Sequence, residues 1–562
     1  MGLSPISLML AFTDWTMHLA ASPGRQMLLA QQAAALSRQA LTKSWQQQIA
    51  IDADAEPIQE TDPRFSDAGW NKWPFNFLKE SFKASDAWWR DATRLDGMSR
   101  HHHHLVSFFT HQGLDALSPS NWPVTNPEVL KTGLASLGRS WIQGYQNYAQ
   151  DLIEHPKARH NNNADTLKPL AFEVGKDVAL TPGKVVFRNH LIELIQYMPT
   201  TELVYPEPLL IVPSCIMKYY ILDLSPANSM VKYLVSQGHT VFMISWRNPD
   251  ATDRNLGMQD YLQLGVMDAM AAVKSLANAP RIHAMGYCLG GTFLSIVAAA
   301  LGREEGVENQ NQLPELASVT LLAALTDFSE PGELGVFIDD DQLKTLRAQM
   351  VRTGYLSGRQ MADSFQFLNS RSLVWSRNTH RYLLGQNEVG NDMMSWNADV
   401  TRLPERMHSE YLSSLYLDNA LAAGRYRFDN VGLGLKDIKA PMLVVATARD
   451  HIAPWRSVYK IHLLTDTPIT FILAAGGHNA GIISEPGHPR RSYQMDGVEK
   501  DNGWNEPDEW SAKAPQFDGS WWEAMHNWLH QRSGAPVPPP PIDPATILGN
   551  APGEYVMVRY AD

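Results

Sequence analysis

The stretch Arg281–Ala300 reads RIHAMGYCLGGTFLSIVAAA, and its pattern indicates the fold of the chain. The short apolar run Ile282–Met285 predicts a buried strand, and Thr292–Ala300 predicts a helix of small, mostly apolar residues. Between them the chain turns through GYCLGG, residues 286–291. Glycines on both sides of Cys288 indicate a turn that is too tight for neighbouring Cβ atoms. The pattern therefore predicts a strand, a sharp turn that presents Cys288, and a helix.

A strand, a glycine-flanked turn and a helix in this order form the nucleophile elbow of an α/β-hydrolase. Cys288 is the predicted nucleophile, at a position where hydrolases usually carry serine. The pentapeptide by itself fits a small buried cysteine equally well. Catalysis is favoured by the strand before the turn, the helix after it, and the acid and histidine candidates further along the chain.

The acid and the base of such a site follow the nucleophile in that order, each after a strand. The apolar run Met442–Ala446 predicts a strand that leads to Asp450, the predicted acid. The run Ile469–Ala474 predicts another strand, and it leads through two glycines to His478, the predicted base. The sequence therefore predicts a triad of Cys288, His478 and Asp450.

Two other residues compete for these roles. Asp327 follows the predicted strand Ser318–Leu325 and is the second candidate for the acid. His451 stands next to Asp450, which is too early in the chain for the base, and a structural role is expected for it.

The oxyanion hole of this fold uses the backbone N–H of the residue after the nucleophile, here Leu289. A second N–H comes from the loop after an earlier strand. The fully apolar run Leu209–Val212 predicts that strand, which places the second donor near Cys215. The Cys215 side chain itself is interpreted as structural.

Strands and helices alternate over much of the chain. Further strands are predicted at Lys184–Asn189, Ile192–Tyr197, Thr240–Trp246 and Tyr555–Val558, the last at an edge, and a helix at Asp260–Ala277. The predicted architecture is an α/β-hydrolase fold with a mostly parallel, doubly wound sheet, a helical cap insertion and a helical N-terminal domain.

The expected domains are a helical N-terminal extension (1–60), a helical N-terminal domain (61–170) and a catalytic domain (171–562). The cap occupies about 326–440, where helical patterns continue without a clear strand. Caps of this kind exclude water from a site.

The composition excludes several classes of protein. The net charge of −12 argues against nonspecific nucleic-acid binding. Only two cysteines occur, Cys215 and Cys288, which excludes a disulfide framework and favours a reducing cytoplasm. Asp14 and His18 interrupt the N-terminal apolar run and no basic region precedes it, so no signal peptide is predicted. No stretch is long and apolar enough to predict a membrane span.

His101–His104 has no spaced carboxylate or cysteine nearby in the sequence, so neither a metal site nor a cofactor is predicted.

A cysteine nucleophile favours acyl transfer. His478 can generate the thiolate, which is the reactive form. A thioester-linked acyl-enzyme keeps roughly the group-transfer potential of a thioester substrate, whereas a serine ester loses much of it. The residues therefore favour an enzyme that takes an acyl group from a thioester and passes it to an alcohol.

The chain resembles class I polyhydroxyalkanoate synthases, bacterial enzymes that polymerise (R)-3-hydroxyacyl-CoA into a storage polyester. The resemblance covers the chain from about Phe65 onward. It rests on SPSNWPVTNP (118–127), LLIVPSCIMKYYILDL (209–224), GHTVFMISWRNPD (238–250), GYCLGGT (286–292), DHIAPW (450–455) and GSWW (519–522). Two positions depart from the family pattern: Ser214 stands where proline is usual, and Asn479 stands where an apolar residue is usual.

The resemblance implies that Cys288, Asp450 and His478 are the catalytic residues. It also implies short-chain substrates such as 3-hydroxybutyryl-CoA, a homodimer, and a location in the cytoplasm at the surface of polyester granules, with granule-associated proteins as partners. The base that activates the 3-hydroxyl during elongation stays open between His478 and Asp450. The expected role of residues 1–60 is in granule association or dimer stability.

Two other functions remain as alternatives. The first is a cysteine-nucleophile thioesterase or polyester hydrolase of the same fold, which releases free hydroxy acid. The second is a non-catalytic granule-associated scaffold, in which Cys288→Ala leaves function intact.

Overall fold

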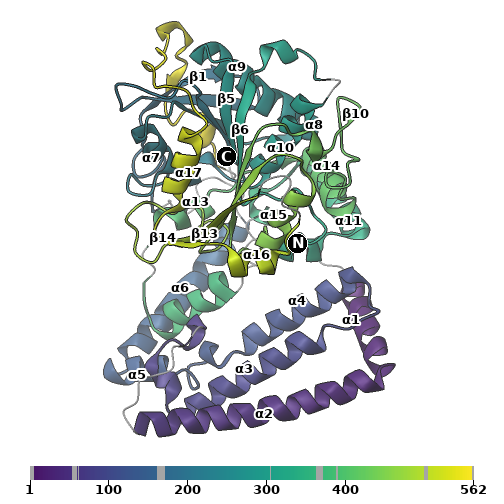
Figure 1. Cartoon of the computed structure of the whole chain (residues 1–562). Coiled ribbons are helices and arrows are strands. Elements are labelled where there is room, and N and C mark those ends of the chain that lie inside the picture. Colours follow the sequence, from purple (N-terminus) through teal and green to yellow (C-terminus); the bar gives the residue numbers. More distant parts are fainter. Residues whose placement is uncertain are drawn as a thin grey trace. The chain divides into compact units, whose positions relative to one another are not determined.

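The structure is a computed structural model. It describes residues 5–52, 60, 62–160, 171–303, 306–361, 371–387, 390–498 and 504–559. The chain divides into two compact units: Met1–Leu167 with Asp363–Val389, and Lys168–Ala362 with Gly390–Asp562. The described part of the first unit is helical, and the second unit contains a large sheet (Figure 1).

Helices make up most of the described part of the first unit, and the first four of them pack against one another. The helices are α1 (Pro5–Ala20), α2 (Pro23–Asp52), α3 (Phe75–Ala92), α4 (Arg100–Leu117), α5 (Pro127–Ala135) and α6 (Arg139–His160). Helix α2 is fixed along α3 at two points. The Trp88 indole donates to the Leu29 carbonyl at 2.9 Å, and the Asn76 amide donates to the Ser44 carbonyl at 2.8 Å.

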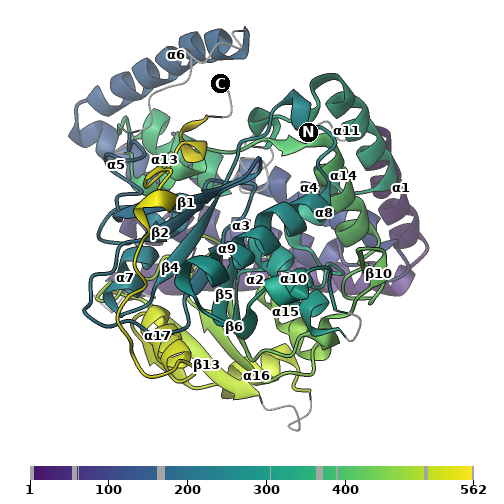
Figure 2. The same ribbon diagram turned by 90° about the horizontal axis from the view of Figure 1, so that it is seen from above.

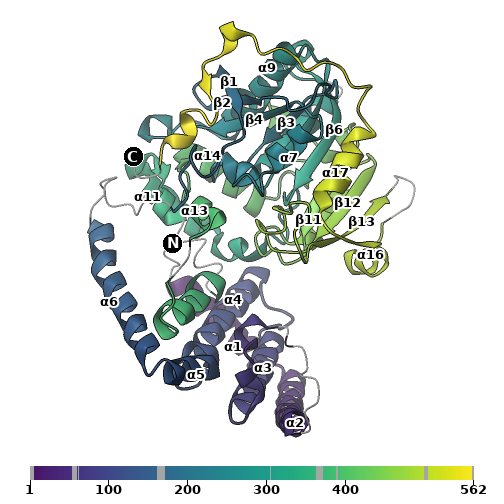
Figure 3. The same ribbon diagram turned by 90° about the vertical axis from the view of Figure 1, so that its left-hand side faces the viewer.

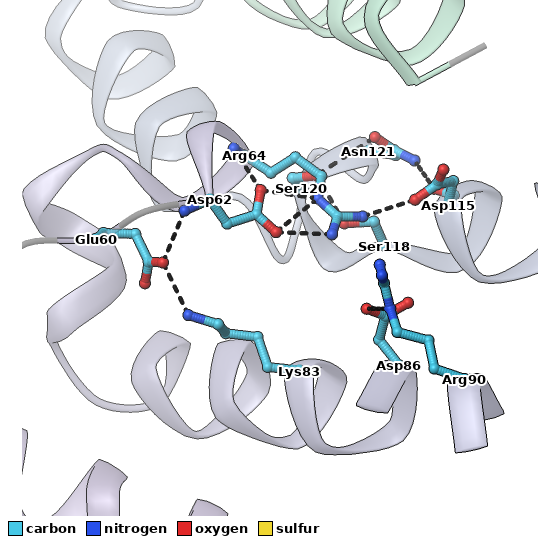
Figure 4. A network of polar contacts seen from close by, with 10 residues as sticks. All are labelled: Glu60, Asp62, Arg64, Lys83, Asp86, Arg90, Asp115, Ser118, Ser120 and Asn121. Atoms are coloured by element: carbon cyan, nitrogen blue, oxygen red, sulfur yellow. Dashed lines mark hydrogen bonds and ion pairs between the residues drawn. The ribbon is translucent and has the colours of Figure 1, made fainter. Parts of the chain in front are cut away.

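A polar network holds the connection between α4 and α5 (Figure 4). The Arg64 guanidinium donates to Asp62 at 2.7 Å and to Asp115 at 2.9 Å. The Asn121 amide donates to the Asp115 carbonyl at 2.7 Å, which closes the turn after α4. Asn126 then caps α5 by accepting from the N–H groups of its first turn. The SPSNWPVTNP stretch is therefore a structural corner.

The segment Asp363–Val389 belongs to the first unit, although the sequence placed it within the cap of the catalytic domain. Its described part includes the short π-helices η10 (Arg371–Ser376) and η11 (Thr379–Leu383). Arg381 and Tyr382 both bond to Asp151 of α6 at 2.8 Å, and the Asn147 amide donates to the Arg381 carbonyl at 3.0 Å. These contacts join sequence-distant residues, which no local pattern reveals.

The sheet of the second unit has eleven strands in the order β14-β13-β12-β11-β6-β5-β3-β4-β2-β1-β15. The central six, β4 to β12 in that order, are parallel, and the strands at both edges are antiparallel. The sheet is therefore mixed rather than mostly parallel. The strands are β1 (Gly183–Arg188), β2 (Ile192–Tyr197), β3 (Leu209–Val212), β4 (Val241–Trp246), β5 (Arg281–Tyr287), β6 (Glu315–Leu322), β11 (Met442–Thr447), β12 (Ile469–Ala474), β13 (Ser492–Val498), β14 (Gln516–Asp518) and β15 (Gly549–Asn550).

Helices cover both faces of this sheet, as the doubly wound prediction required (Figure 2). Helices α7 (Met230–Ser236) and α17 (Trp521–His530) share one hydrophobic core with inward residues of the strands. Helices α9 (Asp268–Ala277) and α10 (Leu289–Gly302) contact β3, and α10 also contacts β5 and β6. Near one edge, α17 lies beside β12, where the Trp528 indole donates to Thr470 at 2.9 Å (Figure 3).

Most of the predicted strands are present, and the errors lie at the edges. None of residues 492–497 of β13 is buried and all three residues of β14 are exposed, so neither strand forms the apolar run that predicts a strand. The predicted edge strand Tyr555–Val558 is wrong. Residues Tyr555–Met557 form a 3₁₀ turn, because the N–H groups of Glu554 and Tyr555 donate to the buried Glu193 carboxylate, each at 2.9 Å.

The cap region between β6 and β11 is mainly helical. In the second unit it contains α11 (Asp340–Thr353), α13 (Asp392–Asn397), α14 (Glu405–Tyr411) and the π-helix η12 (Leu412–Leu417). Two pairs of two-residue strands interrupt the helices: β7 (Tyr355–Leu356) with β8 (Leu403–Pro404), and β9 (Arg427–Phe428) with β10 (Val431–Gly432). Such short strands are not visible in a periodicity pattern.

Candidate active site

The elbow around Cys288 has the predicted geometry. Strand β5 ends at Tyr287, helix α10 begins at Leu289, and Cys288 lies between them at φ 52° and ψ −124°. A positive φ is costly for a residue with a Cβ and is typical of a nucleophile elbow. The Cys288 N–H donates to the Leu322 carbonyl of β6 at 2.9 Å, which fixes the strained residue to the sheet.

Glycines at the elbow are required by close backbone approaches. A Cβ on Gly290 would lie 2.2 Å from the carbonyl oxygen of Val212 and 2.5 Å from that of Pro213. A Cβ on Gly286 would lie 2.4 Å from the Cα of Gly291. The elbow therefore packs directly against the loop that follows β3.

That loop contains Cys215, the predicted second oxyanion residue. It is held by two bonds: the Trp246 indole donates to the Pro213 carbonyl at 2.9 Å, and the Thr401 hydroxyl donates to the Cys215 carbonyl at 2.6 Å. Burial raises the pKa of the Cys215 thiol well above its usual range, so this side chain is a neutral thiol. Leu289 is the first residue of α10, where a backbone N–H has no acceptor within the helix.

Asp450 and His478 form a buried pair. The Asp450 carboxylate and the His478 Nδ1 lie 2.7 Å apart. The other Asp450 oxygen accepts the N–H groups of Ile452 and Ala453 at 2.9 and 2.8 Å, and Thr447 donates to the His-facing oxygen at 2.9 Å. Burial opposes ionisation most strongly, yet His478 and these bonds hold the pKa of the Asp450 carboxyl below its ordinary value. The DHIAPW stretch thus supplies both the acid and the amides that keep it charged.

His478 faces both other members of the predicted triad. Burial is the strongest influence and lowers the pKa of the imidazole, but the charges of Asp450 and Cys288 and hydrogen bonds to both raise it well above 6.5. The structure therefore brings Cys288, His478 and Asp450 together in a proton-transfer chain.

The competing candidates are placed differently. Asp327 accepts the N–H of Ser329 at 2.7 Å and the Asn419 amide at 3.2 Å. His451 is next to the pair, and burial lowers the pKa of its imidazole, which keeps it neutral. Of the two carboxylates considered for the acid, Asp450 is the one bonded to His478.

The loop that carries His478 is supported by a tandem of tryptophans that sequence reasoning did not assign to the site. The Trp521 indole donates to the Gly481 carbonyl and the Trp522 indole donates to the Ile482 carbonyl, both at 2.9 Å. Both side chains are almost completely buried. The GSWW stretch was a signal in the sequence, but only the fold shows that it holds the base loop.

Two cap tyrosines also approach the nucleophile, and the sequence gave no signal for either. The hydroxyls of Tyr411 and Tyr416 lie 3.3 Å apart; Tyr411 is buried and Tyr416 is half-buried. The pKa of both phenols lies above its ordinary value. Burial is the main cause, and the contact between the two hydroxyls and the nearby Cys288 also act on it. The cap therefore places neutral, apolar-bodied side chains near Cys288.

Within the described residues, no group of three or more His, Cys, Asp or Glu side chains is arranged to hold a metal ion. The histidine run lies in α4, and its His102 bonds to Asp14 of α1 at 2.6 Å. The fold thus supplies a carboxylate that the local sequence lacks, and the contact joins two helices. Among the described helices, none has the length and apolar character needed to span a bilayer.

Comparison with known proteins identifies the family. Residues 61–234 match the family described as "Poly-beta-hydroxybutyrate polymerase (PhaC) N-terminus", residues 1–25 match "Poly-beta-hydroxybutyrate polymerase N terminal", and residues 208–484 match "alpha/beta hydrolase fold". The chain is 38% identical to the poly(3-hydroxyalkanoate) polymerase of Methylorubrum extorquens, over 90% of this chain and 83% of that protein. This chain belongs to the poly(3-hydroxyalkanoate) polymerase family.

Other polymerases of the family agree with this assignment. The chain is 36% identical to poly(3-hydroxyalkanoate) polymerase subunit PhaC of Rhizobium meliloti, over 91% of this chain and 82% of that protein. The corresponding protein of Cupriavidus necator is 35% identical, over 84% of this chain and 78% of that protein. The predictions of the family, of the α/β-hydrolase fold and of an acyltransferase enzyme are confirmed. The match at residues 1–25 lies outside the stretches on which the resemblance was based.

The close packing of Gly290 against the backbone at the end of β3 can be tested by substitution. Gly290→Ala places a methyl group against two backbone carbonyls that cannot move independently, so we expect the folded protein to lose about 3 kcal/mol of stability or to fail to fold. Denaturant unfolding measures the change. Gly113→Ala is the control, because Gly113 is an exposed residue of α4 with open space around it. Equal stability of the two variants would contradict the close packing of the elbow.

Proposed function

We propose that this polymerase transfers (R)-3-hydroxyacyl groups from CoA thioesters to a growing polyester, and that Cys288 carries the acyl group. The observation that carries the proposal is the buried chain from Asp450 through His478 to a cysteine on a nucleophile elbow. His478 has a raised pKa because Asp450 and Cys288 favour its protonated form. A thiolate paired with an imidazolium is the reactive state that covalent catalysis needs.

Acylation begins when His478 removes the proton from the Cys288 thiol. The thiolate attacks the thioester carbonyl of the substrate, and the negative charge develops on the carbonyl oxygen. The N–H groups of Leu289 and Cys215 are the proposed donors to this oxygen, at the positive end of α10. The C–S bond to CoA then breaks, and His478 returns its proton to the leaving thiolate.

Elongation uses the same groups with an alcohol as the nucleophile. We assign the base for the incoming 3-hydroxyl to His478 rather than to Asp450. The Asp450 side chain is completely buried, and its oxygens accept from His478, Thr447 and two backbone amides. It has no exposed oxygen to offer to a substrate, so its proposed role is to orient His478 and to stabilise its charge.

In the proposed mechanism, the cap keeps water away from the acyl-enzyme. An acyl-enzyme that polymerises must meet another hydroxyl before it meets water. Tyr411 and Tyr416 place a buried and a half-buried aromatic side chain near Cys288. The proposed substrates are short-chain acyl groups, with 3-hydroxybutyryl-CoA first, on the resemblance of GYCLGG to the short-chain form of the elbow. No cofactor is needed for this chemistry.

The proposed setting is a homodimer at the surface of a polyester granule in the cytoplasm, in contact with granule-associated proteins. Large apolar side chains on α1 and α2 support contact with an apolar surface. Met17 is 66% exposed and Trp45 is 73% exposed. Single exposed apolar residues are common, but several on two consecutive helices favour a docking role.

The test of the function is purified protein with (R)-3-hydroxybutyryl-CoA, following thiol release and turbidity together. We expect thiol release with growing turbidity, and neither with Cys288→Ala. Thiol release in a clear solution, with free hydroxy acid, would make the protein a hydrolase. No thiol release from this or longer acyl-CoA substrates, with granule association intact in Cys288→Ala, would make it a scaffold.

The division of roles between Asp450 and His478 gives a second test. Asp450→Asn keeps the shape of the acid but removes its charge, so His478 loses the partner that raises its pKa. We expect Cys288 to acylate with the first substrate, while elongation slows about a hundredfold or more. Single-turnover CoA release measures the first step and polymer yield measures the second. An equal loss in both steps would mean that Asp450 only orients His478 and that its stabilisation of the His478 charge has no separate role in elongation.

The role of the N-terminal helices is tested by point substitution. Deleting residues 1–60 would uncover α3, because Trp88 and Asn76 bond to α2. Exposed residues are better targets, and we expect Met17→Ser with Trp45→Ser to reduce binding to polyester particles while thiol release in solution is kept. Co-sedimentation with the particles measures binding. Unchanged binding and an unchanged dimer would remove this role.

A further inference from the structure

Two residues that flank the proposed nucleophile and base are bonded to each other. Tyr287 directly precedes Cys288, and Asn479 directly follows His478. The Tyr287 hydroxyl donates to the Asn479 side-chain oxygen at 2.7 Å. The bond joins the end of β5 to the loop after β12, two elements that are not neighbours in the sheet.

The tyrosine end of this bond is rigid. Tyr287 is 2% exposed and belongs to the core of the second unit. Burial, with the nearby Cys288 and Asp450, raises the pKa of its phenol well above the ordinary value, so the hydroxyl remains a donor. Its ring centroid lies 5.7 Å from that of His478, which places the ring alongside the imidazole.

The asparagine end is fixed by the loop and by the cap. The Asn479 carbonyl accepts the N–H groups of Ile482 and Ile483 at 3.1 and 3.0 Å, so the residue begins a tight turn. Its side-chain amide also donates to Asn397 of α13 at 3.4 Å. An apolar side chain at position 479 makes neither side-chain bond, and it leaves the Tyr287 hydroxyl without this acceptor.

We propose that the Tyr287–Asn479 hydrogen bond is a positioning contact that sets the distance and orientation of His478 relative to Cys288. The inference rests on the proposed roles of Cys288 and His478. Proton transfer between two loops depends on their separation within a few tenths of an ångström. The bond connects those loops one residue away from each reacting side chain. Tyr287 and Asn479 are thus positioning residues, and neither contacts the acyl group in this scheme.

The test measures the rate at which iodoacetamide alkylates Cys288 as a function of pH, which requires no polymer synthesis. The variants are Tyr287→Phe, Asn479→Leu and the double variant. A Cys288→Ala protein supplies the background from buried Cys215. Tyr382→Phe is the matched control, because it removes a comparable hydroxyl bond, to Asp151 at 2.8 Å, in the first unit. Thermal unfolding of each variant identifies any that does not fold.

The midpoint of the wild-type profile is the reference for the variants. Each single variant moves it to higher pH by about half a unit, which corresponds to about 0.7 kcal/mol. The double variant moves it no further, because both changes remove the same bond. The kcat for CoA release falls with little change in KM, and Tyr382→Phe behaves as wild type.

Two results would overturn the proposal. A midpoint that is the same in wild type and in the folded single variants, or shifts that add in the double variant, would remove the positioning contact and leave the function intact. CoA release that persists in Cys288→Ala would overturn both the contact and the proposed role of Cys288.

Discussion

The backbone of Cys288 is the constraint on which the rest of the site depends. Its φ of 52° and ψ of −124° lie in a region that residues with a Cβ seldom occupy, at a cost of about 1–3 kcal/mol. The bond from its N–H to Leu322 and the burial of α10 from Leu289 to Ala300 offset that cost. The strained residue presents its thiol at the N-terminus of α10, where the first backbone N–H groups are the proposed donors to the substrate oxygen.

The parallel centre of the sheet makes the other half of the site possible. The C-terminal ends of the parallel strands β5, β11 and β12 lie on the same side of the sheet. Cys288, Asp450 and His478 therefore meet there, although 190 positions separate Cys288 from His478. A buried carboxylate and imidazole are expensive to desolvate. The pair is retained because the amides of Ile452 and Ala453 and the Thr447 hydroxyl satisfy the carboxylate. The tryptophans of α17 then hold the loop on which the imidazole stands.

Much of this arrangement could be predicted from the sequence because it depends on local patterns. The apolar runs of β2, β3 and β12 have the same bounds in the sequence prediction and in the structure. The order of nucleophile, acid and base selected Asp450 and His478 from many carboxylates and histidines. What could not be predicted depends on contacts between distant segments: Asp151 with Arg381, Glu193 with the amides of residues 554 and 555, and Tyr411 near Cys288. Strands β13 and β14 were missed because an exposed antiparallel edge needs no apolar run.

The most direct test of the central claim is the covalent intermediate itself. The protein is mixed with (R)-3-hydroxybutyryl-CoA, quenched in acid within a fraction of a turnover, digested, and examined by mass spectrometry. The account predicts hydroxybutyryl units on the peptide that contains Cys288, removed by neutral hydroxylamine as a thioester is, and none on the peptide that contains Cys215. Release of CoA without an adduct on Cys288, or with the acyl group on another residue, would contradict it.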